Sequence, residues 1–155
     1  MYYLCNTHRK TFSNNPIKAL QDWKVFIETG QSKLKNSDPY HATLYFGNAF
    51  EISQILLNQP CRFHKTQLKR IDRFMISGFY LSECYKRSQR FDEQHQLLMD
   101  IYNQLCILSS SELALQQSLT SNIDFTKALI DNECQTKLYE LNLTSSRLNR
   151  NININ

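Results

Sequence analysis

The sequence contains little glycine and little proline, with 3 residues of each in a chain of 155. This scarcity excludes collagen-like chains and Gly-rich or Pro-rich low-complexity chains. It also disfavours an all-β fold, which uses both residues in its many turns. No apolar run reaches about 18 residues, so we expect no transmembrane helix and no membrane partner.

Motifs of common enzyme classes are also lacking. The sequence has no Gly-rich phosphate-binding loop, no Gly-x-Ser-x-Gly and no His-Glu-x-x-His. His41 and His95 fall on predicted helices, where surface or packing roles are far commoner than acid–base catalysis. We therefore expect a protein that is not an enzyme.

The first residues show no signal-peptide pattern. They read Met-Tyr-Tyr-Leu-Cys-Asn-Thr-His-Arg, with no basic start and no apolar stretch before a cleavage site. The 5 cysteines are an odd number, so they cannot all pair within one chain and are most simply free thiols. These features predict a cytoplasmic protein.

Apolar residues recur at helical spacing along most of the chain. They predict helices at about residues 16–28, 39–58, 64–90, 93–108 and 112–141. Asn15-Pro16 and Asp38-Pro39 each place a capping side chain before a proline, a typical helix start, and Gly30 is a candidate helix end. Apolar residues surround the helix at 39–58, which is typical of a central helix. Because short loops make sequential helices antiparallel, we expect an all-α antiparallel bundle of about five helices.

The length suits one domain. We assign residues 1–141 to a single helical domain that begins with an irregular N-terminal segment at 1–15. Residues 142–155 hold five Asn and two Arg in a low-complexity run, so we expect them to form a disordered tail.

Residues 80–107 resemble a helix hairpin of the tetratricopeptide repeat (TPR) family. Leu81 takes the consensus leucine, Ser82 stands at the usual glycine, and Phe91-Asp92-Glu93 is similar to the aromatic–acidic turn of the family. Residues 38–50 resemble a second copy, in which Gly47 follows a proline-led junction. Gly47 and Ser82 lie 35 positions apart, close to the TPR repeat length of about 34 residues.

This resemblance implies TPR-like helix hairpins that bind a partner peptide or helix on their inner face. The outward residues of the first helices would then contact the partner; they are Asn48, Glu51, Glu83, Lys86 and Arg87. The implied function is that of an adaptor, chaperone or regulator. A homodimer is a further expectation, because a short helical array leaves apolar ends to cover.

Charge divides the chain into a basic and an acidic part. Residues 61–90 hold eight Lys or Arg and two Asp or Glu, whereas residues 91–140 hold two and eight. The basic strip spans residues 62–73 and consists of Arg62, Lys65, Lys69, Arg70 and Arg73. We expect Lys69, Arg70 and Arg73 to contact the protein partner. A nucleic-acid-binding helical domain is the alternative, because such a strip also suits a phosphate backbone.

Two Cys-x2-His pairs leave a second alternative open. Cys5 and His8 form one pair, and Cys61 and His64 form the other. Two thiolates and two imidazoles suit a tetrahedral Zn²⁺ site. Together the pairs predict a zinc-stapled regulatory protein.

Overall fold

The computed structural model describes residues 3–61, 63–111 and 115–132, and these residues are helical with no strand. The labelled helices are α1 (Asn6–Asn14), α2 (Pro16–Lys35), α3 (Pro39–Leu57), α4 (His64–Arg87) and α5 (Phe91–Ser111). A sixth helical segment covers residues 115–132. The predicted all-α class is confirmed. The predicted helix end at residue 141 and the predicted tail at 142–155 lie outside the described residues.

Side-chain caps fix the starts of α2 and α3 where the sequence predicted them. The Lys18 backbone N–H donates to Asn15 Oδ1 at 3.0 Å, and the His41 backbone N–H donates to Asp38 Oδ1 at 3.2 Å. In both helices a proline occupies the first turn, where its missing N–H costs nothing. The hydrogen bonds from His41 lower the pKa of the Asp38 carboxyl.

Gly30 does not end α2, which corrects the prediction that residues 31–37 form a connection. The helix runs on to Lys35. Gly30 is buried, and a Cβ placed there would lie 2.7 Å from the Phe46 ring on α3. The glycine therefore permits a close approach of two helices rather than a chain reversal.

The N-terminal segment is also more regular than predicted. Residues 6–14 form α1, in place of the irregular segment expected at 1–15. Phe12 is buried and belongs to a small core with Leu4, Ala19 and Ile52. α1 has few apolar residues, so its own sequence pattern does not predict a helix. Packing of one side of α1 on this small core stabilises it.

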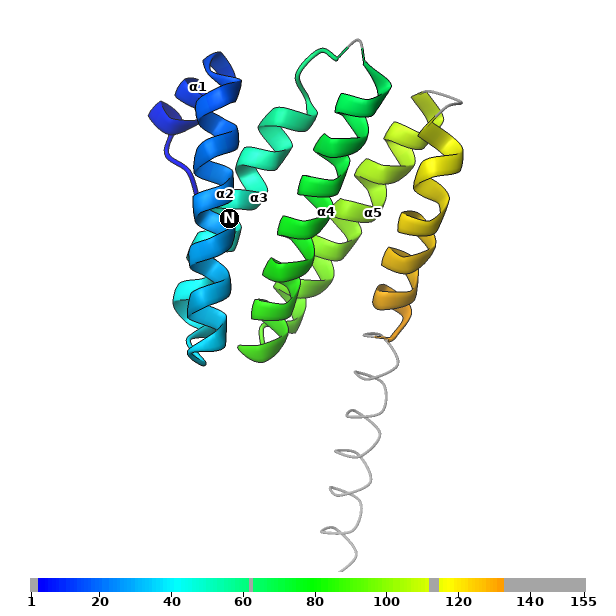
Figure 1. The fold of residues 1–155 in the computed structure, drawn as a ribbon. Coiled ribbons are helices and arrows are strands. Elements are labelled where there is room, and N and C mark those ends of the chain that lie inside the picture. Colours follow the sequence, from blue (N-terminus) through cyan, green and yellow to red (C-terminus); the bar gives the residue numbers. More distant parts are fainter. Residues whose placement is uncertain (1–2, 62, 112–114, 133–155) are drawn as a thin grey trace, which may run out of the picture.

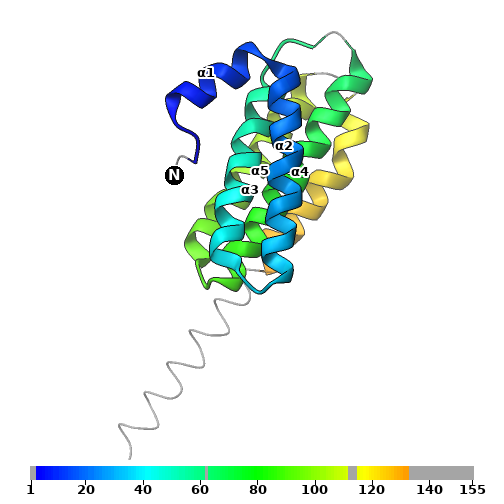
Figure 2. The same ribbon diagram turned by 60° about the vertical axis from the view of Figure 1, so that its left-hand side comes forward.

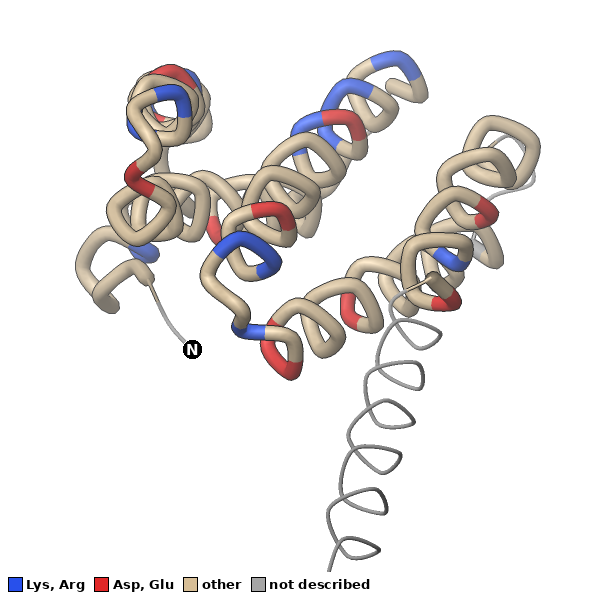
Figure 3. Tube along the Cα trace, turned by 90° about the horizontal axis from the view of Figure 1, so that it is seen from below, with Lys and Arg blue, Asp and Glu red and all other residues tan. Residues whose placement is uncertain are grey.

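The helices are arranged in two layers (Figure 1). α2, α4 and segment 115–132 form the front layer, and α3 and α5 lie behind them. Sequential helices after α1 run in opposite directions, so α2 and α4 point the same way. Seen from below, the helices alternate between the layers along the array (Figure 3). α1 crosses beside α2 and α3 (Figure 2).

The main core lies between the two layers. Phe46, Phe74 and Ile101 are almost completely buried and belong to one cluster contributed by α3, α4 and α5. Gly78 allows α5 to approach, because a Cβ there would lie 3.2 Å from Phe50 and closer still to the flexible end of Ile101. α3 has buried residues on most of its circumference, as the sequence predicted for a central helix.

Candidate functional site

An apolar groove separates α2 from α4 on the front of the array. It has a volume of about 590 Å³. Its lining residues come from these two helices alone; they are Trp23, Ile27, Gln31, Ile76, Phe79, Tyr80 and Glu83. Such a concave, mainly apolar surface with a few polar groups is typical of a binding site.

Hydrogen bonds across the groove floor hold its aromatic walls in place. Trp23 Nε1 donates to Ser77 Oγ at 2.8 Å, and Gln31 Nε2 donates to the Tyr80 hydroxyl at 2.7 Å. The Tyr80 ring also stacks on Phe46 of α3, with centroids 4.7 Å apart. The walls are therefore set by the folded chain before any partner binds.

Apolar surface continues from the groove toward segment 115–132. Phe79 meets Phe125 edge to face, with ring centroids 5.2 Å apart. Ile76 remains 42% exposed and Phe125 52% exposed. Exposed apolar groups gathered on one face, unlike single scattered ones, are typical of an interaction surface. We call the α2–α4 groove together with Phe125 the inner face.

Basic side chains occupy the N-terminal half of α4, at one end of the inner face. The guanidinium of Arg73 lies 5.8 Å from the centroid of the Trp23 ring, and Lys69 lies one helical turn before it. Partial burial lowers the pKa of the Arg73 guanidinium, while Asp72 opposes that shift. α4 has no acidic residue in its first turn to offset its positive helix end. This end of the inner face is therefore electropositive (Figure 3).

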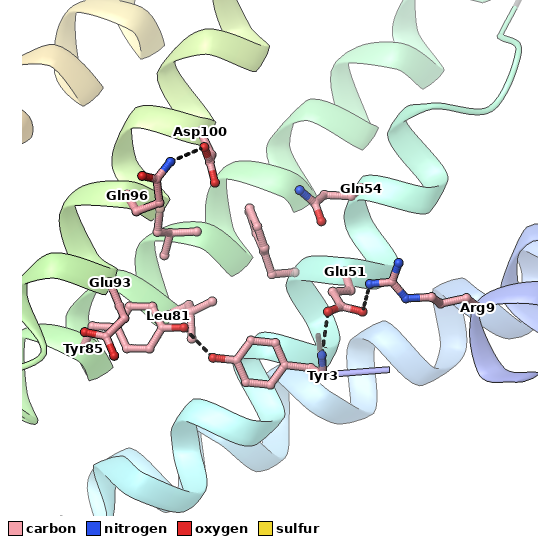
Figure 4. A pocket seen from close by; sticks show the side chains of 11 residues that line it. Tyr3, Arg9, Glu51, Gln54, Leu81, Tyr85, Glu93, Gln96 and Asp100 are labelled. Atoms are coloured by element: carbon pink, nitrogen blue, oxygen red, sulfur yellow. Dashed lines mark hydrogen bonds and ion pairs between the residues drawn. The ribbon is translucent and has the colours of Figure 1, made fainter. Parts of the chain in front are cut away.

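A second cavity of about 300 Å³ lies on the back of the array, between α3 and α5 (Figure 4). Here the N-terminal residues supply part of the wall. The ring of Tyr3 packs against Gly47, and its hydroxyl contacts the hydroxyl of Tyr85 on α4. Burial is the main cause that raises the pKa of the Tyr3 phenol well above its ordinary value.

Glu51 anchors these N-terminal residues to α3. Its carboxylate accepts hydrogen bonds from the backbone N–H groups of Tyr3 at 2.6 Å and Leu4 at 3.1 Å. It also forms an ion pair with Arg9 Nη2 at 2.7 Å. Glu51 is only 5% exposed. The prediction that Glu51 faces a partner is therefore corrected, because its oxygens are used within the chain.

The other predicted partner-binding residues lie in different surroundings. Asn48 donates to the Leu44 carbonyl of its own helix at 2.8 Å, and Arg70 donates to the Gln59 carbonyl at 2.7 Å. Glu83 lines the groove and pairs with Arg87 at 2.7 Å. The remaining three are Lys69, Arg73 and Lys86, of which the first and last are exposed. Lys69, Arg73, Glu83 and Arg87 recur along α4 at helical spacing; Glu83 lines the groove, and Arg73 lies over Trp23 at its edge.

The two Cys-x2-His pairs do not form the predicted zinc site. Cys5 Sγ lies 3.2 Å from His8 Nδ1, whereas Cys61 Sγ is directed to the Phe63 carbonyl at 3.4 Å. Among the described residues, no three His, Cys, Asp or Glu side chains form a group able to hold a metal ion. The four-ligand site at Cys5, His8, Cys61 and His64 is therefore not assembled.

Sequence reasoning missed the apolar residues of the inner face. Trp23 and Phe79 fit the helical apolar pattern, and that pattern alone favours a core position for both. The signal that could have found them is the large number of apolar residues on α4, which lie on more than one side of the helix, at Phe74, Ile76 and Phe79. That excess indicates two apolar faces, one for the core and one for another surface.

None of the described helices is long and apolar enough to span a membrane. Comparisons with protein-family models, with curated proteins and with solved structures each found no match to this chain.

Proposed function

We propose that this protein is a non-enzymatic interaction module that binds a peptide or helix of a partner protein on its inner face. The observation that carries the proposal is the open α2–α4 groove, whose apolar residues Ile76 and Phe79 continue to the half-exposed Phe125. Covering such apolar surface favours association by roughly 25 cal/mol for each Å² removed from water. An adaptor, chaperone or regulator in the cytoplasm fits this activity.

We also infer that the hairpins are TPR-like. Two observations support this part of the proposal: α4 and α5 form a hairpin with its turn at residues 88–90, and the first helices of successive hairpins share the inner face. The starts of α2 and α4, however, are 48 positions apart, a longer interval than the TPR repeat of about 34 residues. The predicted second copy at residues 38–50 lies on α3, which is in the other layer and is not a first helix, so the 35-position spacing of Gly47 and Ser82 does not mark a repeat. The common element is thus the layered hairpin arrangement rather than the repeat length.

Binding of nucleic acid is the second candidate function, and the basic strip on α4 favours it. Within that strip Arg70 is bonded to the Gln59 carbonyl, Lys65 and Lys69 are exposed, and Arg73 lies over the Trp23 ring at the edge of the groove. Arg62 lies outside the described residues. A phosphate backbone on this strip would leave the apolar groove uncovered, so a protein partner accounts for more of the surface.

Site-specific photo-crosslinking tests the proposed function. A photoreactive phenylalanine analogue replaces Phe125 on the inner face or, as the matched control, Ile107 on α5, which is 61% exposed. We expect a discrete protein adduct from position 125 and none from position 107. Equal adducts at both positions, no adduct at position 125, or adducts to nucleic acid alone would overturn the proposal.

A further inference from the structure

The chemistry of the partner follows from the charge and shape of the inner face. We propose that the groove between α2 and α4 binds an acidic amphipathic helix of another protein, an inference that rests on the proposed function. The apolar face of that helix covers Ile76, Phe79 and Phe125. Its carboxylates meet Lys69 and Arg73.

The shape of the groove suits a helix. α2 and α4 run in the same direction with the groove between them, so a third helix can place its side chains between the two ridges (Figure 1). From Lys69 to Glu83 α4 rises about 21 Å, at 1.5 Å per residue. A partner helix of about 14 residues therefore spans both the basic end and the apolar groove.

The apolar part of the surface calls for apolar anchors at helical spacing. Ile76 and Phe79 lie on α4, and Phe125 joins them from the neighbouring helical segment. The hydrogen bonds of Trp23 to Ser77 and of Gln31 to Tyr80 fix the floor in advance. A prearranged site loses less conformational entropy on binding, so it suits a partner segment that folds onto it.

The basic end of the groove has few counter-charges within the described chain. Lys65, Lys69, Arg70 and Arg73 form no ion pair with a described carboxylate. Asp72 is the one acidic residue among them in residues 64–75. At the other end of the groove, by contrast, Glu83 is already paired with Arg87. Charge complementarity therefore places the acidic residues of the partner beside Lys69 and Arg73.

The chain's own C-terminal sequence is a poor match for this occupant. Residues 133–155 hold three Lys or Arg and two Asp or Glu, so their net charge has the same sign as the basic end. Like charges brought together oppose binding. An acidic segment from a different protein satisfies both the apolar and the basic part of the inner face.

Selection from a displayed peptide library tests the proposal. The library contains helices of about 14 residues with apolar residues at helical spacing and Asp, Glu, Gln, Lys or Arg elsewhere. It is selected against the full chain, and fluorescence anisotropy then measures the binding of the enriched peptides. We expect these peptides to hold more Asp and Glu than Lys and Arg, and to bind more weakly as salt is added.

Variants of the full chain locate the bound peptide. We expect Lys69→Glu/Arg73→Glu to weaken binding by about tenfold or more, and Phe79→Ser to weaken it as well. The matched control is Lys10→Glu/Lys127→Glu, which changes two exposed lysines outside the inner face by the same charge and should bind like the parent. Circular dichroism confirms that each variant is folded.

The other outcomes separate this proposal from the proposed function. Enriched peptides that carry no acidic excess, and that Phe79→Ser alone weakens, would overturn the acidic partner and leave the interaction module standing. Failure to enrich any peptide, together with binding of a nonspecific DNA duplex that Lys69→Glu/Arg73→Glu abolishes, would overturn both. Self-association of the chain that blocks every peptide would assign the inner face to a second copy and overturn the acidic helix.

Discussion

The back and the front of the helical array are completed in different ways. On the back, Tyr3 packs between α3 and α4, and buried Glu51 holds the backbone beside it (Figure 4). On the front, the described residues leave the groove between α2 and α4 open. The same chain thus covers one face with its own N-terminal residues and leaves the other available. The comparison teaches that polar residues on the back stabilise the fold, whereas apolar residues on the front, such as Ile76 and Phe125, stay partly exposed.

The largest expected effect comes from removing the anchor on the back. Glu51→Ala removes the acceptor of two backbone N–H groups and one partner of Arg9. We expect the free energy of unfolding to fall by about 2–4 kcal/mol, because two N–H groups lose their acceptor at a cost of about 1–3 kcal/mol each. Urea denaturation measures it. Glu28→Ala, which breaks an exposed pair with Lys24, is the control and should cost at most about 1 kcal/mol. Equal losses of stability in the two variants would show that Glu51 stabilises the fold no more than an exposed ion pair does.

The next effect concerns the fit of Tyr3 against α3. A Cβ at Gly47 would overlap the Tyr3 ring, so Gly47→Ala should destabilise the fold by about 1–3 kcal/mol. In a chain that also carries Tyr3→Ala the ring is gone, and alanine should then stabilise the helix by up to about 1 kcal/mol. A double-mutant cycle from urea denaturation measures this change of sign. A Gly47→Ala effect that is the same in both backgrounds would show that the ring does not pack there.

A smaller effect is expected on the front. Trp23→Phe keeps an aromatic ring but removes the N–H that donates to Ser77, a loss of about 1 kcal/mol. The half-exposed Ile76, changed to Ser, should alter stability by no more than about 0.5 kcal/mol. Thermal denaturation compares the two. If Ile76→Ser were the more destabilising, the inner face would be part of the core and not a free surface.

The last effect is the pH dependence that Tyr3 contributes on the back. The raised pKa of Tyr3 means that folding favours the neutral phenol. Its contribution to stability is therefore complete below the ordinary tyrosine pKa of 10.0 and is lost as the pH rises above that value. We expect stability to fall between about pH 9 and pH 11, with a shallower fall in Tyr3→Phe. Urea denaturation midpoints across that range measure how steeply stability falls with pH. Identical slopes in the parent and in Tyr3→Phe would show that the Tyr3 phenol is not buried.

The fold was predictable where local signals decide. Asn15-Pro16 and Asp38-Pro39 mark helix starts because a capping side chain and a fixed φ angle act within one turn. Gly30 was wrongly predicted to end its helix, because glycine occurs both at helix ends and where two helices approach closely. Which of the two applies depends on Phe46, 16 positions away in the sequence but in contact in space.

The candidate site was predictable only in part, for the same reason. The helical spacing of Lys69, Arg73 and Glu83 on α4 is visible in the sequence, and the structure places Glu83 in the groove and Arg73 over the Trp23 ring beside it. The helical pattern around Glu51 likewise predicts an exposed side chain, yet a backbone segment about 48 residues earlier in the chain covers it. Nothing in the residues around Glu51 indicates that contact, because it is made by chain topology rather than by periodicity.

The position of Tyr3 has a mechanical consequence for the opposite face. Tyr3 touches α3 through Gly47 and α4 through Tyr85, so it bridges two successive hairpins from behind. Because α2 packs on α3, the tilt between these hairpins sets the distance between α2 and α4. Tyr3 therefore links the two hairpins from behind, while the bonds of Trp23 to Ser77 and of Gln31 to Tyr80 link them from the front.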